Sequence, residues 1–247
     1  MLRRLAALIA AATLSASAFA AGANGFEACA QDFYQGFAPR PTTNQPGQVR
    51  ALCFDDFAVL HSGQSKTPIY AAEHLTRESL SAARGKERTD KFYAEARLPA
   101  AERATLEDYS RSGWDRGHNA PAGDRATDAG MSQSFSLSNM NPQAPLNNRG
   151  VWAKNVEKPT RQYAMRSAEG IYVLTGPIYR GQVTTIGAGR VWVPHSLFKL
   201  VYDPAKKRAW VYVVDNTDAA TVTGTYSYTD LVRMTGMEFL PPGALVN

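Results

Sequence analysis

The sequence has little of what marks fibrous, disordered and metal-cluster proteins. Its 247 residues include only two cysteines and four histidines. It has no collagen period, no heptad run and no repeat at a period of about 20–50 residues. Charged residues make up 20% and hydrophobic residues 44%, which is the balance of a globular protein. Two cysteines exclude a four-cysteine zinc site, and a chain of this length can fold without a metal or disulfide framework.

Only one long apolar run is present, and it lies at the N-terminus. Met1–Arg4 is short and cationic, Leu5–Ala21 is apolar or small, and Ala18-Phe19-Ala20 fits a small-x-small cleavage site. We therefore predict a secretory signal peptide over residues 1–20. The alternative is a membrane anchor, for which the alanine-rich run falls short of the roughly 20 strongly apolar residues that a span needs.

Removal of this segment changes both the location and the charge of the protein. Residues 21–247 are predicted to form a single domain in the periplasm or outside the cell, with no stable membrane association. The loss of Arg3 and Arg4 lowers the formal net charge from +5 to 25 − 22 = +3. Part of the basic balance therefore belongs to the export signal.

Export would place both cysteines in an oxidising compartment, where the simplest prediction is a disulfide between Cys29 and Cys53. Loop closure of this size contributes roughly 3 kcal/mol to stability. The alternative is a catalytic cysteine, but neither cysteine lies near a histidine in the sequence.

The hydrophobic pattern indicates an α+β fold with a central, mostly antiparallel sheet and flanking helices. Strands are predicted at 52–62, 68–75, 171–175, 191–202 and 208–215. A helix is predicted within 148–168, interrupted at Pro159, and a short one within 226–240. Irregular structure is expected in a Pro-rich arm at 38–47, in a loop or exposed helix at 78–97, and at 108–125.

Most of the residues that could take part in catalysis lie in two polar segments. The first, 114–124, places Asp115, Arg116 and His118 within four residues, next to glycines. A histidine can accept a proton from water near neutral pH, and an arginine can grip a phosphate through two N–H donors. Taken alone, a single histidine in a polar loop is more often structural.

The second segment, 135–152, contains five side-chain amides, at Asn139, Asn141, Gln143, Asn147 and Asn148. An amide oxygen is a suitable ligand for Mg²⁺, which accepts one or two protein oxygens and keeps most of its waters. On composition alone, an Asn-rich turn region is the simpler interpretation.

Together these segments closely resemble the DNA/RNA non-specific endonuclease family, the ββα-metal-finger (His-Me finger) group that includes endonuclease G. The resemblance rests on Asp115-Arg116-Gly117-His118, on Leu137-Ser138-Asn139-Met140 with Pro142-Gln143, and on Asn147-Asn148-Arg149-Gly150 with Trp152. It continues in Leu174–Tyr179, in Val193-Pro194 and in Phe198-Lys199, and covers most of the mature chain.

The resemblance implies a role for each matched residue. His118 corresponds to the family's general base, and Asn148 to the asparagine that holds a single Mg²⁺, for which Mn²⁺ could substitute. Arg116 would steady the phosphate, and Arg88, on a shorter match, would neutralise the transition state. Asn139 corresponds to a supporting amide. We interpret Asp115 as a buttress of the loop, and His61, His74 and His195 as structural.

One departure from the family pattern concerns an acidic residue. The family commonly has a Glu eight residues after the metal-binding Asn, on the same helix. Here that position is Val156, and Glu157 comes one residue later. A helical bulge would return Glu157 to the metal-facing side, and such bulges are frequent at functional sites. The alternative is a solvated glutamate without a role.

The resemblance predicts a secreted, Mg²⁺-dependent endonuclease that hydrolyses DNA and RNA with little sequence preference. No base-reading element is recognisable, and backbone contacts carry no sequence information. Phosphate contacts are expected from seven basic residues: Arg84, Lys86, Arg88, Arg111, Arg125, Arg149 and Lys154. The alternatives are an inactive nucleic-acid binder of the same fold, for which the shifted Glu157 is the only hint, and a phosphodiesterase of small nucleotides. A homodimer and an inhibitor protein are conceivable partners.

Overall fold

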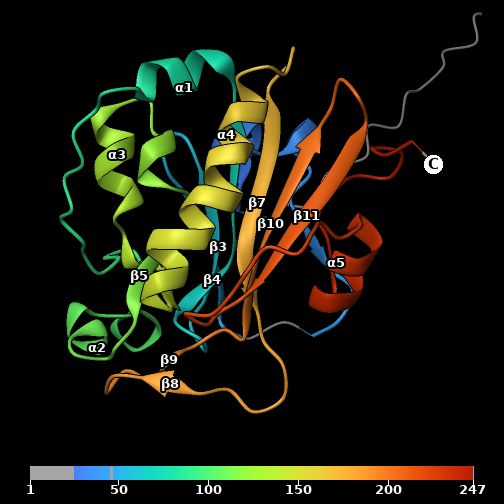
Figure 1. Ribbon diagram of the computed structural model, residues 1–247. Coiled ribbons are helices and arrows are strands. Elements are labelled where there is room, and N and C mark those ends of the chain that lie inside the picture. Colours follow the sequence, from blue (N-terminus) through green and yellow to red (C-terminus); the bar gives the residue numbers. More distant parts are fainter. Residues whose placement is uncertain (1–24, 45–46, 247) are drawn as a thin grey trace, which may run out of the picture.

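The computed structural model describes residues 25–44 and 47–246 (Figure 1). The predicted signal peptide at 1–20 lies outside the described residues. Within them, no helix combines the length and the apolar character that crossing a bilayer requires.

A six-stranded antiparallel sheet in the order β11-β10-β7-β4-β3-β2 forms the centre of the molecule (Figure 1). Its strands are β2 (Val49–Cys53), β3 (Ala58–Ser62), β4 (Thr67–Leu75), β7 (Ile171–Ile178), β10 (Ser196–Asp203) and β11 (Arg208–Asp215). Three short pairs lie outside it: β1 (Arg40–Pro41) with β12 (Met237–Glu238), β5 (Asp115–His118) with β6 (Met140–Gln143), and β8 (Thr185–Ile186) with β9 (Val191–Trp192).

The helices are short except for one. They are α1 (Arg77–Ala83), α2 (Leu106–Tyr109), α3 (Asp128–Ser134), α4 (Lys158–Ala164) and α5 (Tyr228–Thr235). A π-helical segment, η6 (Asn147–Glu157), runs directly into α4, so that residues 147–164 form one long helix. The 3₁₀ segments are η1 (Glu27–Asp32), which is kinked at Cys29, η2 (Tyr34–Gly36), η3 (Ala100–Glu102), η4 (Ala122–Asp124) and η5 (Leu137–Asn139). The predicted α+β fold is confirmed.

Both faces of the sheet are covered, which gives three layers. Along β10, Phe198 and Leu200 pack into the cluster that contains α5 and the N-terminal turns. Leu197 and Val201 point the other way, against η6 and α4. Alternate strand residues point to opposite faces, so every residue of β10 is buried. The long helix lies across one face of the sheet, with α1, α2 and α3 beyond it (Figure 1).

The predicted bridge is present: a disulfide joins Cys29 in η1 to Cys53 at the end of β2. Cys29 is fully buried and belongs to the large apolar cluster that contains α5. The bridge therefore ties the N-terminal turns to an edge strand of the sheet.

Two predicted strands are wrong in their extent because local turn chemistry interrupts them. The span 52–62 is a hairpin, in which Asp55 and Asp56 occupy the turn between β2 and β3. Aspartate favours turns because its side chain can bond to nearby backbone. The span 191–202 breaks at Pro194, which has no N–H to donate to a central ladder, and β10 begins two residues later.

Two prolines disturb the structure less than the sequence predicts. Strand β7 does not end before Gly176 but continues to Ile178. Proline is tolerated there because β4 pairs only with residues 171–175 of β7, so pairing with β4 requires no N–H from residue 177. The helix is not interrupted at Pro159, which falls in the first turn of α4, where the winding changes. The irregular arm at 38–47 also contains the short strand β1.

Candidate active site

A cavity of about 1070 Å³ opens between β5, α2 and the long helix. It is lined by His118, at the end of β5, and by Asn148 and Glu157, which both lie on the long helix. Five arginines also line it: Arg88, Arg111, Arg116, Arg149 and Arg161. The structure therefore brings most of the predicted site residues to one place and sets five arginines around them.

The β5–β6 hairpin presents the histidine to this cavity. His118 is the last residue of β5 and pairs with Met140. Gly117 pairs with Asn141, and a Cβ on it would collide with the side chain of Gln143, so the close pairing of these strands requires glycine. The strand thus fixes His118 on a rigid two-stranded element.

Asn139 does not line the cavity, although it was expected among the site residues. Its side chain is fully buried behind the hairpin. Its Oδ1 accepts the backbone N–H of Ala120 (2.9 Å), and its Nδ2 donates to the carbonyls of Ala120 and Ser134 (both 2.9 Å). It holds the segment that follows His118 in place, and its side chain does not reach the cavity.

Asp115 orients the asparagine that corresponds to the metal ligand. Its Oδ2 accepts Nδ2 of Asn148 at 3.0 Å, and its two oxygens accept Nε and Nη2 of Arg149 at 2.7 and 2.5 Å. Because the amide nitrogen of Asn148 is engaged in this way, its oxygen is the atom available to a cation. The cavity also presents the carboxylate of Glu157. An amide oxygen and a carboxylate in one polar cavity are a donor set that fits a Mg²⁺ or Mn²⁺ ion.

The π-helical winding of η6 explains how Glu157 reaches the cavity. An α-helix turns about 100° per residue, so a residue nine positions after Asn148 would point to nearly the opposite side. A π-helix absorbs one extra residue per bulge. Consistent with this wider turn, the N–H of Lys158 bonds to the carbonyl of Ala153, five residues back. The one-residue shift of Glu157 therefore no longer favours an inactive protein.

Deleting Asn155, which is exposed, should preserve most of the activity. The deletion places Glu157 eight residues after Asn148, where ordinary α-helical winding directs it to the same side. Insertion of one alanine after Asn155 should instead lower nuclease activity at least as far as Glu157→Gln does. Rates on plasmid DNA for the three variants test this, and a deletion variant as impaired as Glu157→Gln would contradict the proposed function of the bulge.

Burial and neighbouring cations keep the histidine neutral. Burial, followed by the charges of Arg88, Arg125 and Arg116, lowers the pKa of His118 to about 3. Its Nε2 is buried and has no hydrogen-bond partner among the described residues. A neutral imidazole is the form that can accept a proton.

Opposite charges surround the glutamate of the cavity. Burial raises the pKa of Glu157 above its usual value. The charges of Lys199 and Arg161 act in the opposite direction and offset this only in part. Arg161 lies 3.7 Å from Glu157 and donates to Asp124 at 2.9 Å. Arg161 is not among the residues that the sequence singles out, although its position four residues after Glu157 on a helix places the two side chains on one face.

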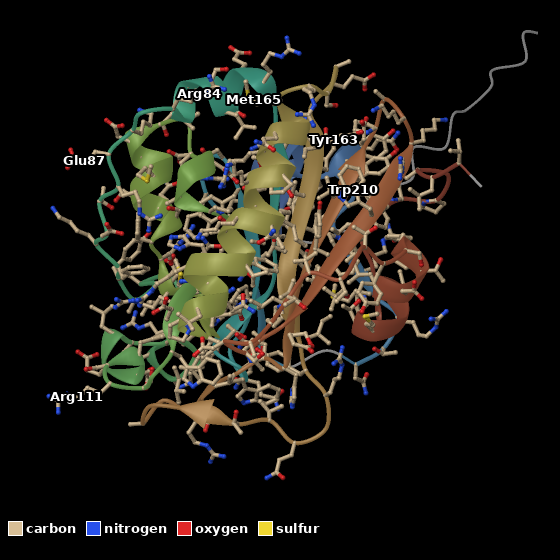
Figure 2. All side chains as sticks on the ribbon, in the orientation of Figure 1. Arg84, Glu87, Arg111, Tyr163, Met165 and Trp210 are labelled. Atoms are coloured by element: carbon tan, nitrogen blue, oxygen red, sulfur yellow. A yellow bond between two sulfur atoms is a disulfide. The ribbon has the colours of Figure 1, made fainter. Side chains whose placement is uncertain are left out.

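The remaining predicted phosphate contacts are only partly compatible with the structure. Arg88, Arg111 and Arg149 line the cavity. The prediction is wrong for Arg125, which is fully buried and bonds to Glu73 and, at 3.0 Å, to Asp56. Arg84, Lys86 and Lys154 lie outside the lining. Figure 2 shows Arg84 near α1 and Arg111 near α2, at opposite ends of this side of the molecule.

The other three histidines have structural partners. His61 bonds to a backbone carbonyl at 2.9 Å and His74 to another at 3.2 Å, whereas Nδ1 of His195 accepts a backbone N–H at 3.1 Å. None of them lines the cavity. Only His118 is therefore placed for chemistry there.

Known proteins of similar sequence are nucleases. A model of the DNA/RNA non-specific endonuclease family matches residues 37–244. Nuclease C1 of Cunninghamella echinulata var. echinulata is 33% identical over 78% of this chain and 84% of that protein. The mitochondrial nuclease EXOG of Danio rerio is 32% identical over 71% of this chain, which spans only 56% of that protein.

A solved structure shows the same fold. The match is to a crystal structure of an EndoG/EndoGI complex, described as revealing the mechanism of EndoG inhibition, with a TM-score of 0.70 and 26% identity. It covers 79% of this chain and 87% of the other.

Proposed function

The chain belongs to the DNA/RNA non-specific endonuclease family, whose members are hydrolases, and on that basis we propose that it is an exported, Mg²⁺-dependent nuclease acting on both DNA and RNA. The observation that carries the proposal is the convergence of His118, Asn148 and Glu157 in one arginine-lined cavity. The family generally uses a divalent metal; the choice of Mg²⁺, with Mn²⁺ as a substitute, is part of the proposal.

His118 acts as the general base. In its neutral form it takes a proton from the water that attacks phosphorus, in line with the leaving 3′ oxygen. Cleavage of that P–O bond, with the leaving 3′ oxygen taking a proton from water, leaves a 5′-phosphate on one product and a 3′-hydroxyl on the other. The strand that carries His118 keeps the imidazole in position throughout.

The arginines bind the phosphate. Arg116 and Arg88 line the same cavity as His118 and present planar guanidinium groups, which match phosphate oxygens through paired N–H donors. Because these contacts address only the backbone, little sequence preference follows. Binding should weaken steeply with salt.

Asn148 would hold the divalent cation directly, and Glu157 would hold a water of its shell. Asp115 fixes the amide of Asn148, and Glu157 supplies a carboxylate on the same helix. When bound, the cation would stabilise the negative charge that develops on the phosphate and the leaving oxygen.

Export is part of the proposal because of the N-terminal residues. The cationic start and apolar run at 1–20 have the composition of a signal peptide, and a disulfide such as Cys29–Cys53 persists in an oxidising compartment. The homodimer and the inhibitor partner stay predictions.

Digestion of supercoiled plasmid and of RNA, with and without EDTA, tests the function. We expect cleavage of both polymers with Mg²⁺ or Mn²⁺, no cleavage with EDTA, and recovery when the metal is added back in excess. Binding of both polymers without turnover in either metal would indicate an inactive binder instead. Cleavage of dinucleotides but not of polymers would indicate a small-nucleotide phosphodiesterase.

A further inference from the structure

Two phenylalanine rings lie directly beneath the cationic groups of the cavity. Phe92 and Phe135 meet edge to face, with centroids 4.9 Å apart. The guanidinium carbon of Arg116 lies 4.1 Å from the centroid of Phe92. The guanidinium carbon of Arg88 lies 5.3 Å from that of Phe135. The imidazole of His118 contacts both rings, at 5.1 Å from Phe135 and 5.8 Å from Phe92.

Of the two rings, Phe135 is the immobile one. It is fully buried, whereas Phe92 lines the cavity and is partly exposed. Backbone bonds join the two segments: the N–H of Tyr93 donates to the carbonyl of Phe135 (3.3 Å), and the N–H of Leu137 donates to the carbonyl of Tyr93 (2.8 Å). The backbone at Phe135 is therefore tied to the segment that carries Phe92, and burial confines its ring.

Arg88 has little else in the described structure to hold it. Its ion pair with Asp90, at 3.1 Å, joins two exposed side chains, with exposures of 50% and 64%. Exposed pairs of this kind contribute little because water screens them and two long side chains must be ordered. The face of a buried aromatic ring attracts a guanidinium more strongly than an exposed carboxylate does, because the ring is already fixed and desolvated.

We propose that Phe135 is a positioning residue, whose ring fixes the imidazole of His118 and the guanidinium of Arg88 relative to each other at the reacting phosphate. The inference rests on the proposed function of these two residues. One side chain serves both groups: its edge-to-face contact orients the base, and its face retains the phosphate-binding cation.

The ring also shields the base from water. The charged groups that face His118 are Arg88, Arg116 and Arg125, all of them positive. With Phe135 in place, burial and these charges together lower the pKa of His118. A smaller side chain at 135 would admit water beside the imidazole and return its pKa toward the ordinary value.

Phe135→Leu, with Phe239→Leu as the matched control, separates positioning from packing. Both residues are buried phenylalanines, but Phe239 packs in the cluster around α5, away from the cavity. Each variant should lose thermal stability. Only Phe135→Leu should lower kcat/KM, by about 10- to 100-fold at a temperature where both are folded. Only in Phe135→Leu should the His118 titration, followed by NMR of its imidazole protons, move to higher pH.

The outcomes distinguish this inference from the function on which it rests. A wild-type protein that cleaves neither polymer would refute the proposed function. An active wild type, with Phe135→Leu matching Phe239→Leu in kcat/KM and in the His118 titration, would overturn the positioning role alone. If Phe135→Leu fails to fold, Phe135→Met retains more of the apolar volume and is expected to give the same two shifts.

Discussion

Replacing His118 with alanine is expected to lower kcat on plasmid DNA by about 10²- to 10⁴-fold, the usual contribution of a general base. The loss should appear in kcat and in kcat/KM alike, because the proton transfer occurs only in the transition state. Substrate binding should change little, since the arginines of the cavity remain. Steady-state rates on plasmid and on RNA measure the first expectation, and a filter-binding titration measures the second.

His195→Ala is the matched control for this variant. His195 is exposed, lies outside the cavity and makes only a hydrogen bond to backbone, so its loss should leave the nuclease rate unchanged. Undiminished cleavage by His118→Ala would remove the histidine from the proposed mechanism.

The pH dependence follows from the same residue. Burial and three arginines lower the pKa of His118 to about 3, so the imidazole stays neutral from mildly acidic to alkaline pH. Protonation would switch the base off only well below the ordinary histidine pKa of about 6.5. The kcat/KM profile should therefore be level through pH 6.5, and an acid limb centred there would contradict the lowered pKa.

The sequence predicts the sheet well where turn chemistry and an apolar run agree. Strand β11 has the predicted bounds 208–215, because a Pro-containing turn precedes it and a continuous apolar run, 209–214, lies between Arg208 and Asp215. The sequence predicts one strand over 52–62 because two aspartates in an apolar run resemble solvent-facing strand residues. Only the pairing of β2 with β3 shows that they lie in a turn. Pairing with β4 likewise decides that β7 can run through Pro177.

The site is predictable only in part because some of its determinants are tertiary. Motif resemblance identifies His118 and Asn148 from their own residue types. It leaves Glu157 with two interpretations, a helical bulge or a solvated glutamate, and does not decide between them; the π-helical winding of the folded chain does. Nor does it single out Phe135, an apolar residue whose role lies entirely in the groups that it contacts.

Replacing Asn148 with alanine should abolish metal-dependent activity at millimolar Mg²⁺. Asn148 is the proposed direct protein ligand, and its side chain is the one that Asp115 holds in place. Loss of an outer-shell partner alone typically weakens metal binding about 10- to 100-fold, so loss of the ligand itself should exceed that range. Calorimetric titration of Mn²⁺ or Mg²⁺ into the metal-free protein measures the affinity directly, independently of turnover.

Asn155→Ala provides the control on the same helix. It removes the same amide from an exposed position outside the cavity, so metal affinity and nuclease rate should match the wild type. A high concentration of Mn²⁺ should restore part of the activity of Asn148→Ala, because Glu157 still supplies a carboxylate to the cavity. If Asn148→Ala binds the metal as tightly as Asn155→Ala does, the cation is held elsewhere and the proposed role of Asn148 fails, whatever the nuclease rates.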